Sequence, residues 1–193
     1  MHSDDNNDVL AALNAATAAA LVAWLGGAFE HSPWVIEVAA AARPFASVAA
    51  LHRACVAAIA AAPEARRIAL VRAHPDLAGK VARAGGLTPE SALEQAGAGL
   101  DRLSSAQFAR FEALNAGYRA RFGWPFVICV RGRSAADILD AFECRMGGAP
   151  PTELDVALRE IAAIAALRLT DLLAQHKSAP LAHHDSALSG ASA

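Results

Sequence analysis

The stretch REIAAIAALRLTDLL, residues 159–173, decides the fold class of this chain. Its apolar residues Ile161, Ile164, Ala165 and Leu172 recur at the spacing that places them on one face of an α-helix. Alanine, the best helix former, recurs throughout this stretch and the whole chain. The sequence therefore predicts an all-α protein built from closely packed helices.

Working outward from this stretch, similar patterns predict about eight helices in a single compact domain. The expected helices are 17–28, one capped by Ser32 with Pro33 at its first position, one of about 15 residues capped by Ser47, 64–73, 91–100, a long one opened by Ser104 or Ser105, one from Ser134 to about 146, and 153–175 capped by Thr152. The run GWPFVICVRG, residues 123–132, is β-like, but no second strand is available to pair with it. We expect it to be a buried extended segment.

The two ends of the chain are polar and lack helical periodicity. We expect a flexible N-terminus at residues 1–12, one helical domain at 13–176 and a disordered tail at 177–193. No interior change of composition argues for a second domain.

Composition excludes several classes of protein. The formal net charge of −2 gives no general attraction to nucleic acid or to an anionic membrane. No apolar run is long enough to span a bilayer, and no basic region precedes one, so we expect a cytoplasmic protein. Cys55, Cys129 and Cys144 lack metal-ligand spacing, so reduced thiols and no metal are expected.

The stretch RAHPDLAGK, residues 72–80, interrupts the helical pattern. Pro75 suits the first position of a new helix, which makes His74 its N-cap residue. The helix N-terminus would lower the pKa of the imidazole and keep it neutral near pH 7, the state that acid–base catalysis uses. The alternative is a histidine that only caps a helix.

Two further groups of polar residues stand out. In SALEQAGAGL, residues 91–100, the spacing gathers Ser91, Glu94 and Gln95 on one side of a short helix, although a Ser-x-x-Glu capping box is the alternative reading. Arg168 falls on the apolar face of its helix and therefore needs a carboxylate partner or a ligand. The sequence leaves both alternatives open.

Six stretches together resemble the OHCU decarboxylases, which act on 2-oxo-4-hydroxy-4-carboxy-5-ureidoimidazoline (OHCU), between urate and allantoin. They are FEHSPWV, RPF, AHPDLAGK, SALEQAGAGL, LNAGYRARFGWPFVICVRG and EIAAIAALRL, in the order and spacing of that family, from about residue 13 to 175. Trp124 departs from the phenylalanine usual there, and we expect only a change in packing.

The resemblance implies an all-helical fold, a homodimer and a carboxy-lyase that yields (S)-allantoin without a cofactor. It implies catalytic roles for His74 and Glu94. It also implies substrate binding by Pro75, Ser91, Gln95, Phe126, Val127, Ile128 and Arg168. The alternatives are a lyase for a related ureido ring and a non-enzymatic helical binding domain.

Overall fold

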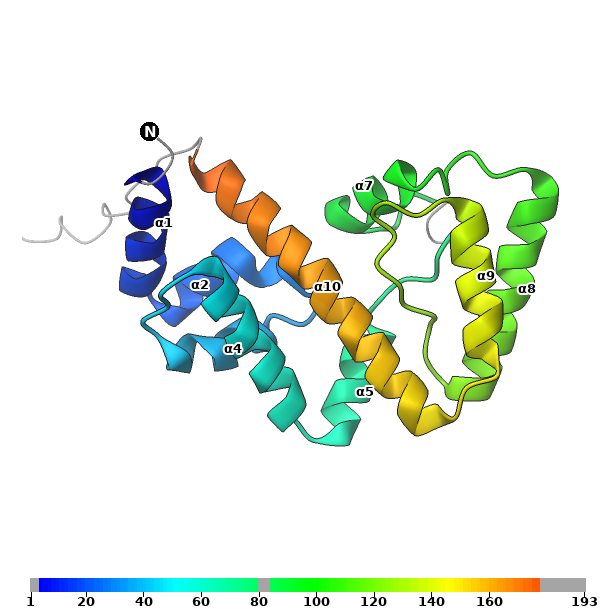
Figure 1. The fold of residues 1–193 in the computed structure, drawn as a ribbon, viewed down its shortest axis with the longest axis horizontal. Coiled ribbons are helices and arrows are strands. Elements are labelled where there is room, and N and C mark those ends of the chain that lie inside the picture. The colour runs from blue at the N-terminus through cyan, green and yellow to red at the C-terminus, as the bar shows by residue number, and fades with distance from the viewer. Residues whose placement is uncertain (1–3, 80–83, 178–193) are drawn as a thin grey trace, which may run out of the picture.

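The protein is described by a computed structural model, which covers residues 4–79 and 84–177. These residues form α-helices, short 3-10 turns and irregular segments, as predicted, and no strand is present among them. The long helix α10, Pro150–Lys177, runs diagonally through the molecule (Figure 1). The N-terminal helices lie on one side of it, and α7, α8 and α9 lie on the other.

Nine α-helices occur in the described ranges, close to the number expected. Their bounds are α1 Asp4–Ala15, α2 Ala18–Leu25, α3 Trp34–Ala39, α4 Val48–Ala61, α5 Glu64–Arg72, α7 Pro89–Gly97, α8 Ser105–Phe122, α9 Ala135–Met146 and α10 Pro150–Lys177. The 3-10 turns η1, Gly26–Ala28, and η2, Ala40–Ala42, follow α2 and α3. Helix α10 packs against α1, α2, α4, α5 and η1, so the chain folds around its last helix.

Residues 4–12 are helical and differ from the flexible segment expected at residues 1–12, of which 1–3 lie outside the described residues. Helix α1 begins at Asp4, and Val9 and Leu10 pack against the core while Leu13 is fully buried. The polar start of the chain conceals this contact, because apolar residues begin only at Val9. The expected tail at 177–193 lies outside the described residues except for Lys177, the last residue of α10.

Three of the expected helix starts are confirmed by side-chain caps. The hydroxyls of Ser47, Ser104 and Ser134 each accept a hydrogen bond from a backbone N–H in the first turn of α4, α8 and α9. Because the first N–H groups of a helix have no partner inside it, these hydroxyls define where each helix begins.

Helices α3 and α10 do not begin at the residues expected. Helix α3 is capped by Pro33 rather than Ser32. Helix α10 begins at Pro150, so Thr152 lies within its first turn and is not the N-cap. Consecutive prolines are tolerated there, because the N–H groups they lack would have no partner inside the helix.

Residues 125–130 of the run are extended, as predicted, and all are buried except half-buried Cys129. The ends of the run differ, because Gly123 caps α8 and residues 131–132 form an exposed turn. Phe126 is fully buried and stacks on Phe142 of α9, with ring centroids 3.9 Å apart. Tyr118 contacts the edge of the same ring at 5.4 Å. Trp124 is also buried and packs beside Phe122, at 6.0 Å between centroids. This aromatic cluster packs the segment against α8 and α9.

The described helices are too short or too polar to cross a lipid bilayer.

Candidate active site

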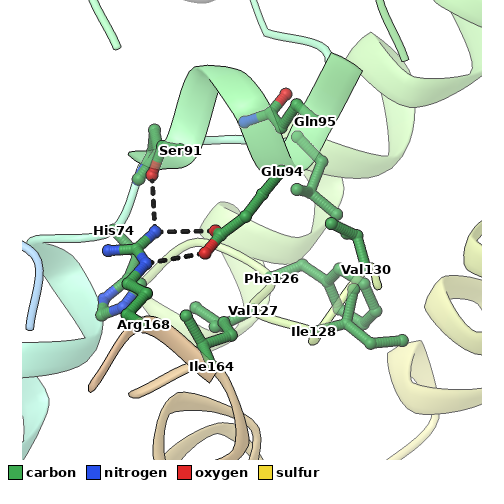
Figure 2. Close-up of a pocket in the computed structure, with 12 residues that line it drawn as sticks. His74, Ser91, Glu94, Gln95, Phe126, Val127, Ile128, Val130, Ile164 and Arg168 are labelled. Atoms are coloured by element: carbon green, nitrogen blue, oxygen red, sulfur yellow. Dashed lines mark hydrogen bonds and ion pairs between the residues drawn. The ribbon is translucent and has the colours of Figure 1, made fainter. Parts of the chain in front are cut away.

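A small cavity lies where α7, α10, the end of α5 and the extended segment meet (Figure 2). Every residue predicted for the site lines it: His74, Pro75, Ser91, Glu94, Gln95, Phe126, Val127, Ile128 and Arg168. Leu77, Val130 and Ile164 complete its wall with apolar side chains. The structure therefore brings together residues that lie up to 94 positions apart in the chain.

Arg168 is the centre of the polar side of the cavity. Its Nε and Nη2 donate to the two carboxylate oxygens of Glu94, each at 2.7 Å. Nη2 also donates to the Ser91 hydroxyl at 3.0 Å, as Figure 2 shows. Nη1 donates to Glu30 at 2.8 Å and faces the Gly27 carbonyl at 3.5 Å. A guanidinium has five N–H donors, so every one of them has a protein acceptor in this structure.

Glu30 does not line the cavity but holds Arg168 in it, a role that was not predicted from the sequence. It is only 3% exposed, and its carboxylate accepts from Arg168, Ser91 and Thr88. Burial raises the pKa of Glu30, but these hydrogen bonds and the charge of Arg168 outweigh it and hold the pKa below its ordinary value. The sequence does contain an indication of this role. An arginine on a core face requires a carboxylate, and Glu30 lies in the apolar stretch GGAFEHSPW.

The predicted N-cap role of His74 is wrong. No helix begins at Pro75 within the described residues, and Ala78 adopts a left-handed conformation with φ of 51°. The Gln95 carboxamide oxygen accepts from the Ala78 N–H at 2.9 Å, and Asn115 donates to the Leu77 carbonyl at 2.9 Å. Side chains from α7 and α8 thus form hydrogen bonds with the backbone groups that would have bonded to each other within a new helix.

His74 is nevertheless held neutral, for a different reason from the one expected. Burial is the largest cause and lowers the pKa of the imidazole to about 4, with the Arg168 charge acting in the same direction. The Leu70 carbonyl and the Glu30 charge oppose it. The ring Nδ1 lies 3.0 Å from the Leu70 oxygen, and a carbonyl can only accept. Nδ1 therefore carries the proton, and Nε2 keeps a lone pair at the cavity.

The pH dependence of activity should report this lowered pKa. Between pH 4 and 6.5 the folded protein keeps His74 neutral while the unfolded chain protonates its histidines, so the fold loses stability in this range while the imidazole stays unprotonated. We expect kcat/KM to fall on the acid side toward pH 4 rather than near 6.5. Stopped-flow rates with circular dichroism at each pH test this, and an acid limb at 6.5 in folded protein contradicts it.

Ser91 and Gln95 have structural contacts besides their place in the cavity wall. Helix α7 is capped by Thr88, whose hydroxyl accepts from the Ser91 N–H, so the Ser-x-x-Glu capping box is wrong. The Ser91 hydroxyl instead donates to Glu30 at 2.9 Å. Gln95 holds the turn after His74, as described above. Both residues therefore position the charged and catalytic candidates around them.

The cavity is small. Its free volume is about 30 Å³, which holds water but no organic ring. A second cavity of about 270 Å³ lies against it, and Glu94 and Arg168 line both. The Glu94–Arg168 pair therefore stands between the inner cavity and the larger outer one. Within the described ranges, no group of three His, Cys, Asp or Glu residues is placed to hold a metal ion.

Comparison with protein families finds a match at residues 14–170 to the OHCU decarboxylase model. A 2-oxo-4-hydroxy-4-carboxy-5-ureidoimidazoline decarboxylase of Haloferax volcanii is 42% identical over 146 residues, 76% of this chain and 84% of that protein. One of Halalkalicoccus jeotgali is 39% identical over 160 residues, 83% of this chain and 89% of that protein.

Among solved structures, that of an (S)-allantoin synthase is similar, with a TM-score of 0.66 and 27% identity. The match covers 84% of this chain and 53% of that one, so the chain spans about half the length of that structure.

Proposed function

The chain belongs to the OHCU decarboxylase family, and from this premise we propose that it is a carboxy-lyase that converts OHCU to (S)-allantoin and CO2 in urate degradation. The observation that carries the proposal is the cavity in which the neutral imidazole of His74 faces the Glu94–Arg168 pair. Family, fold and site are thus consistent with one reaction.

The substrate itself supplies the electron sink for this reaction. The carbon that loses CO2 is bonded to an imine-type C=N, which takes up the electron pair, so we propose that no cofactor is needed. The imine nitrogen is then protonated. The 4-hydroxyl loses its proton and becomes a carbonyl, and the neighbouring carbon gains a proton and forms a C–H bond. The net reaction consumes one proton and releases CO2.

His74 is suited to the proton transfers. Its Nε2 is neutral, buried and basic, and it can take the 4-hydroxyl proton or deliver a proton to the new stereocentre. The apolar side chains of Leu77, Val130 and Ile164 leave little solvent around a bound carboxylate. As CO2 leaves, the charge moves from the poorly solvated carboxylate to the imine nitrogen, where protonation neutralises it, so this environment favours the transition state over the bound substrate.

Glu94 is the exchangeable partner of Arg168. Its side chain is 19% exposed, whereas the Glu30 side chain is 2% exposed and held by three donors. A substrate that enters from the outer cavity takes the place of Glu94 on the guanidinium and frees that carboxylate beside His74. Glu94 then serves in acid–base catalysis. Arg168 binds the substrate, and Glu30 keeps the Arg168 guanidinium in place.

The remaining predicted contacts complete the proposal. Ser91, Gln95 and Pro75 line the wall around the reacting groups, and the 126–128 segment offers backbone groups to the ring. We propose a cytoplasmic homodimer, as the family resemblance implies. Sedimentation analysis tests the dimer, and a monomer at micromolar concentration contradicts it.

The stereochemistry of the product tests the function. Spontaneous loss of CO2 in water leaves a planar intermediate that takes a proton on either face and gives racemic allantoin. Because His74, two residues after α5, and Glu94 of α7 have fixed places in the cavity wall, we expect protonation on one face only. A preference of about 2 kcal/mol gives roughly 30-fold selectivity. The measurement is circular dichroism of the product from freshly generated OHCU, with and without protein. Faster substrate loss with an optically silent product contradicts one-sided protonation.

A further inference from the structure

The extended segment at residues 126–129 lies beside two charged side chains that are not part of the cavity wall. Arg145 of α9 donates from Nη1 to the Val127 carbonyl at 2.8 Å. Glu160 of α10 accepts from the Cys129 N–H at 2.8 Å. These two residues replace the partner strand that the segment lacks, because each forms a hydrogen bond with one backbone group of the segment. We call Arg145 and Glu160 the clamp.

Arg145 is itself rigidly held. Its Nε donates to Glu153 at 3.0 Å, Nη2 also bonds to that carboxylate, and Glu153 is 2% exposed. The Tyr118 hydroxyl donates to the same carboxylate from a fully buried position. The guanidinium carbon lies 4.4 Å from the centroid of the Phe126 ring. The position of the Val127 carbonyl is therefore determined by contacts from α8, α9 and α10.

The clamp fixes the orientation of Ile128. In a planar trans peptide the C=O of one residue and the N–H of the next point in opposite directions. The Val127 carbonyl points to Arg145, so the Ile128 N–H points away from it. The Cys129 N–H points to Glu160, so the Ile128 carbonyl points away from that residue. Neither backbone group of Ile128 forms a hydrogen bond with another residue of 4–79 or 84–177.

We propose that Arg145 and Glu160 are positioning residues that present the Ile128 N–H and C=O to the substrate as a donor–acceptor pair. This inference rests on the proposed function, because the pair complements the adjacent N–H and C=O groups of a urea or lactam edge, as in an antiparallel strand pair. Ile128 lines the cavity, whereas Arg145 and Glu160 do not. The clamp therefore acts on the substrate only through the backbone.

The test uses Glu160, which is only partly buried, so its replacement should leave the protein folded. In Glu160→Ala the Cys129 N–H loses its acceptor, and we expect KM for OHCU and Kd for allantoin to rise about tenfold. Glu160→Gln keeps an acceptor oxygen and should restore values close to wild type. Asp155→Ala removes an exposed carboxylate from the same helix and is the matched control.

Arg145→Lys provides the second arm. Lysine keeps the charge beside Glu153 but lacks the planar fork that reaches Glu153 and Val127 together, so we expect the same rise in KM and Kd. Tyr118→Phe removes another hydrogen bond to Glu153 but keeps the hydrogen bond from Arg145 to the Val127 carbonyl. This variant should lower Tm without changing Kd. If Glu160→Ala and Arg145→Lys bind allantoin as tightly as active wild-type protein does, the inference is overturned. A wild-type protein that does not accelerate OHCU loss instead overturns the proposed function.

Discussion

Replacing His74 by asparagine is expected to lower kcat/KM by about 10²- to 10⁴-fold and to leave the fold intact. The Asn side-chain nitrogen occupies the place of Nδ1 and can keep the bond to the Leu70 carbonyl, which is 3.0 Å from Nδ1 in the structure. It has no counterpart of Nε2, the atom that keeps a lone pair at the cavity. The rate of OHCU loss above background, measured at pH 7, gives the size of the effect.

The control is a histidine with a structural contact elsewhere. The Nε2 of His52 in α4 lies 2.8 Å from the Ala162 carbonyl of α10, and His52 does not line the cavity. His52→Gln keeps a donor near the position of Nε2, so activity should stay within about twofold of wild type. An active His74→Asn variant with normal circular dichroism would remove His74 from the mechanism.

Replacing Arg168 by methionine is expected to abolish activity and to lower the free energy of unfolding by about 3–5 kcal/mol. The change leaves Glu30 and Glu94 without their cation, and the Glu30 side chain is only 2% exposed. Removing one partner of a buried ion pair costs more than the pair contributes, because the other charge stays buried and unpaired. Urea unfolding monitored by circular dichroism measures the loss.

An exposed ion pair gives the comparison. Arg131 bonds to Asp171 at 2.7 Å, and both side chains are 52% exposed. Arg131→Met should lower the free energy of unfolding by about 0.2–1 kcal/mol, because water screens such a pair. Adding Glu30→Gln and Glu94→Gln to Arg168→Met should recover part of the stability but none of the activity. Equal losses in Arg131→Met and Arg168→Met would contradict the role of burial.

The lowered pKa of His74 shows how a correct prediction can rest on a wrong cause. The sequence indicates a histidine next to a proline and predicts a neutral imidazole at a helix N-terminus. The structure keeps the imidazole neutral mainly by burial. Burial of one ring depends on what α7, α10 and the extended segment place over it, and no local pattern around residue 74 contains that information.

The sequence by itself determined every described helix after α1 to within a few residues, the side-chain caps Ser47, Ser104 and Ser134, and the unpaired extended run. Helix periodicity and capping are interactions within a few residues, so the local sequence is sufficient to predict them. The six family stretches determined the reaction and the site residues to test. The core-face position of Arg168 also showed that a buried partner must exist.

Only the tertiary structure decided which groups meet. Glu30, 138 positions from Arg168, is its buried partner. Gln95 and Asn115 hold the turn after His74 and prevent the helix expected at Pro75. Arg145 and Glu160 hold the segment at 126–129 from two different helices. These contacts join elements far apart in the chain, and a hydrogen bond requires atoms within about 3 Å, so they depend on how the helices pack and not on the spacing of residues along any one of them.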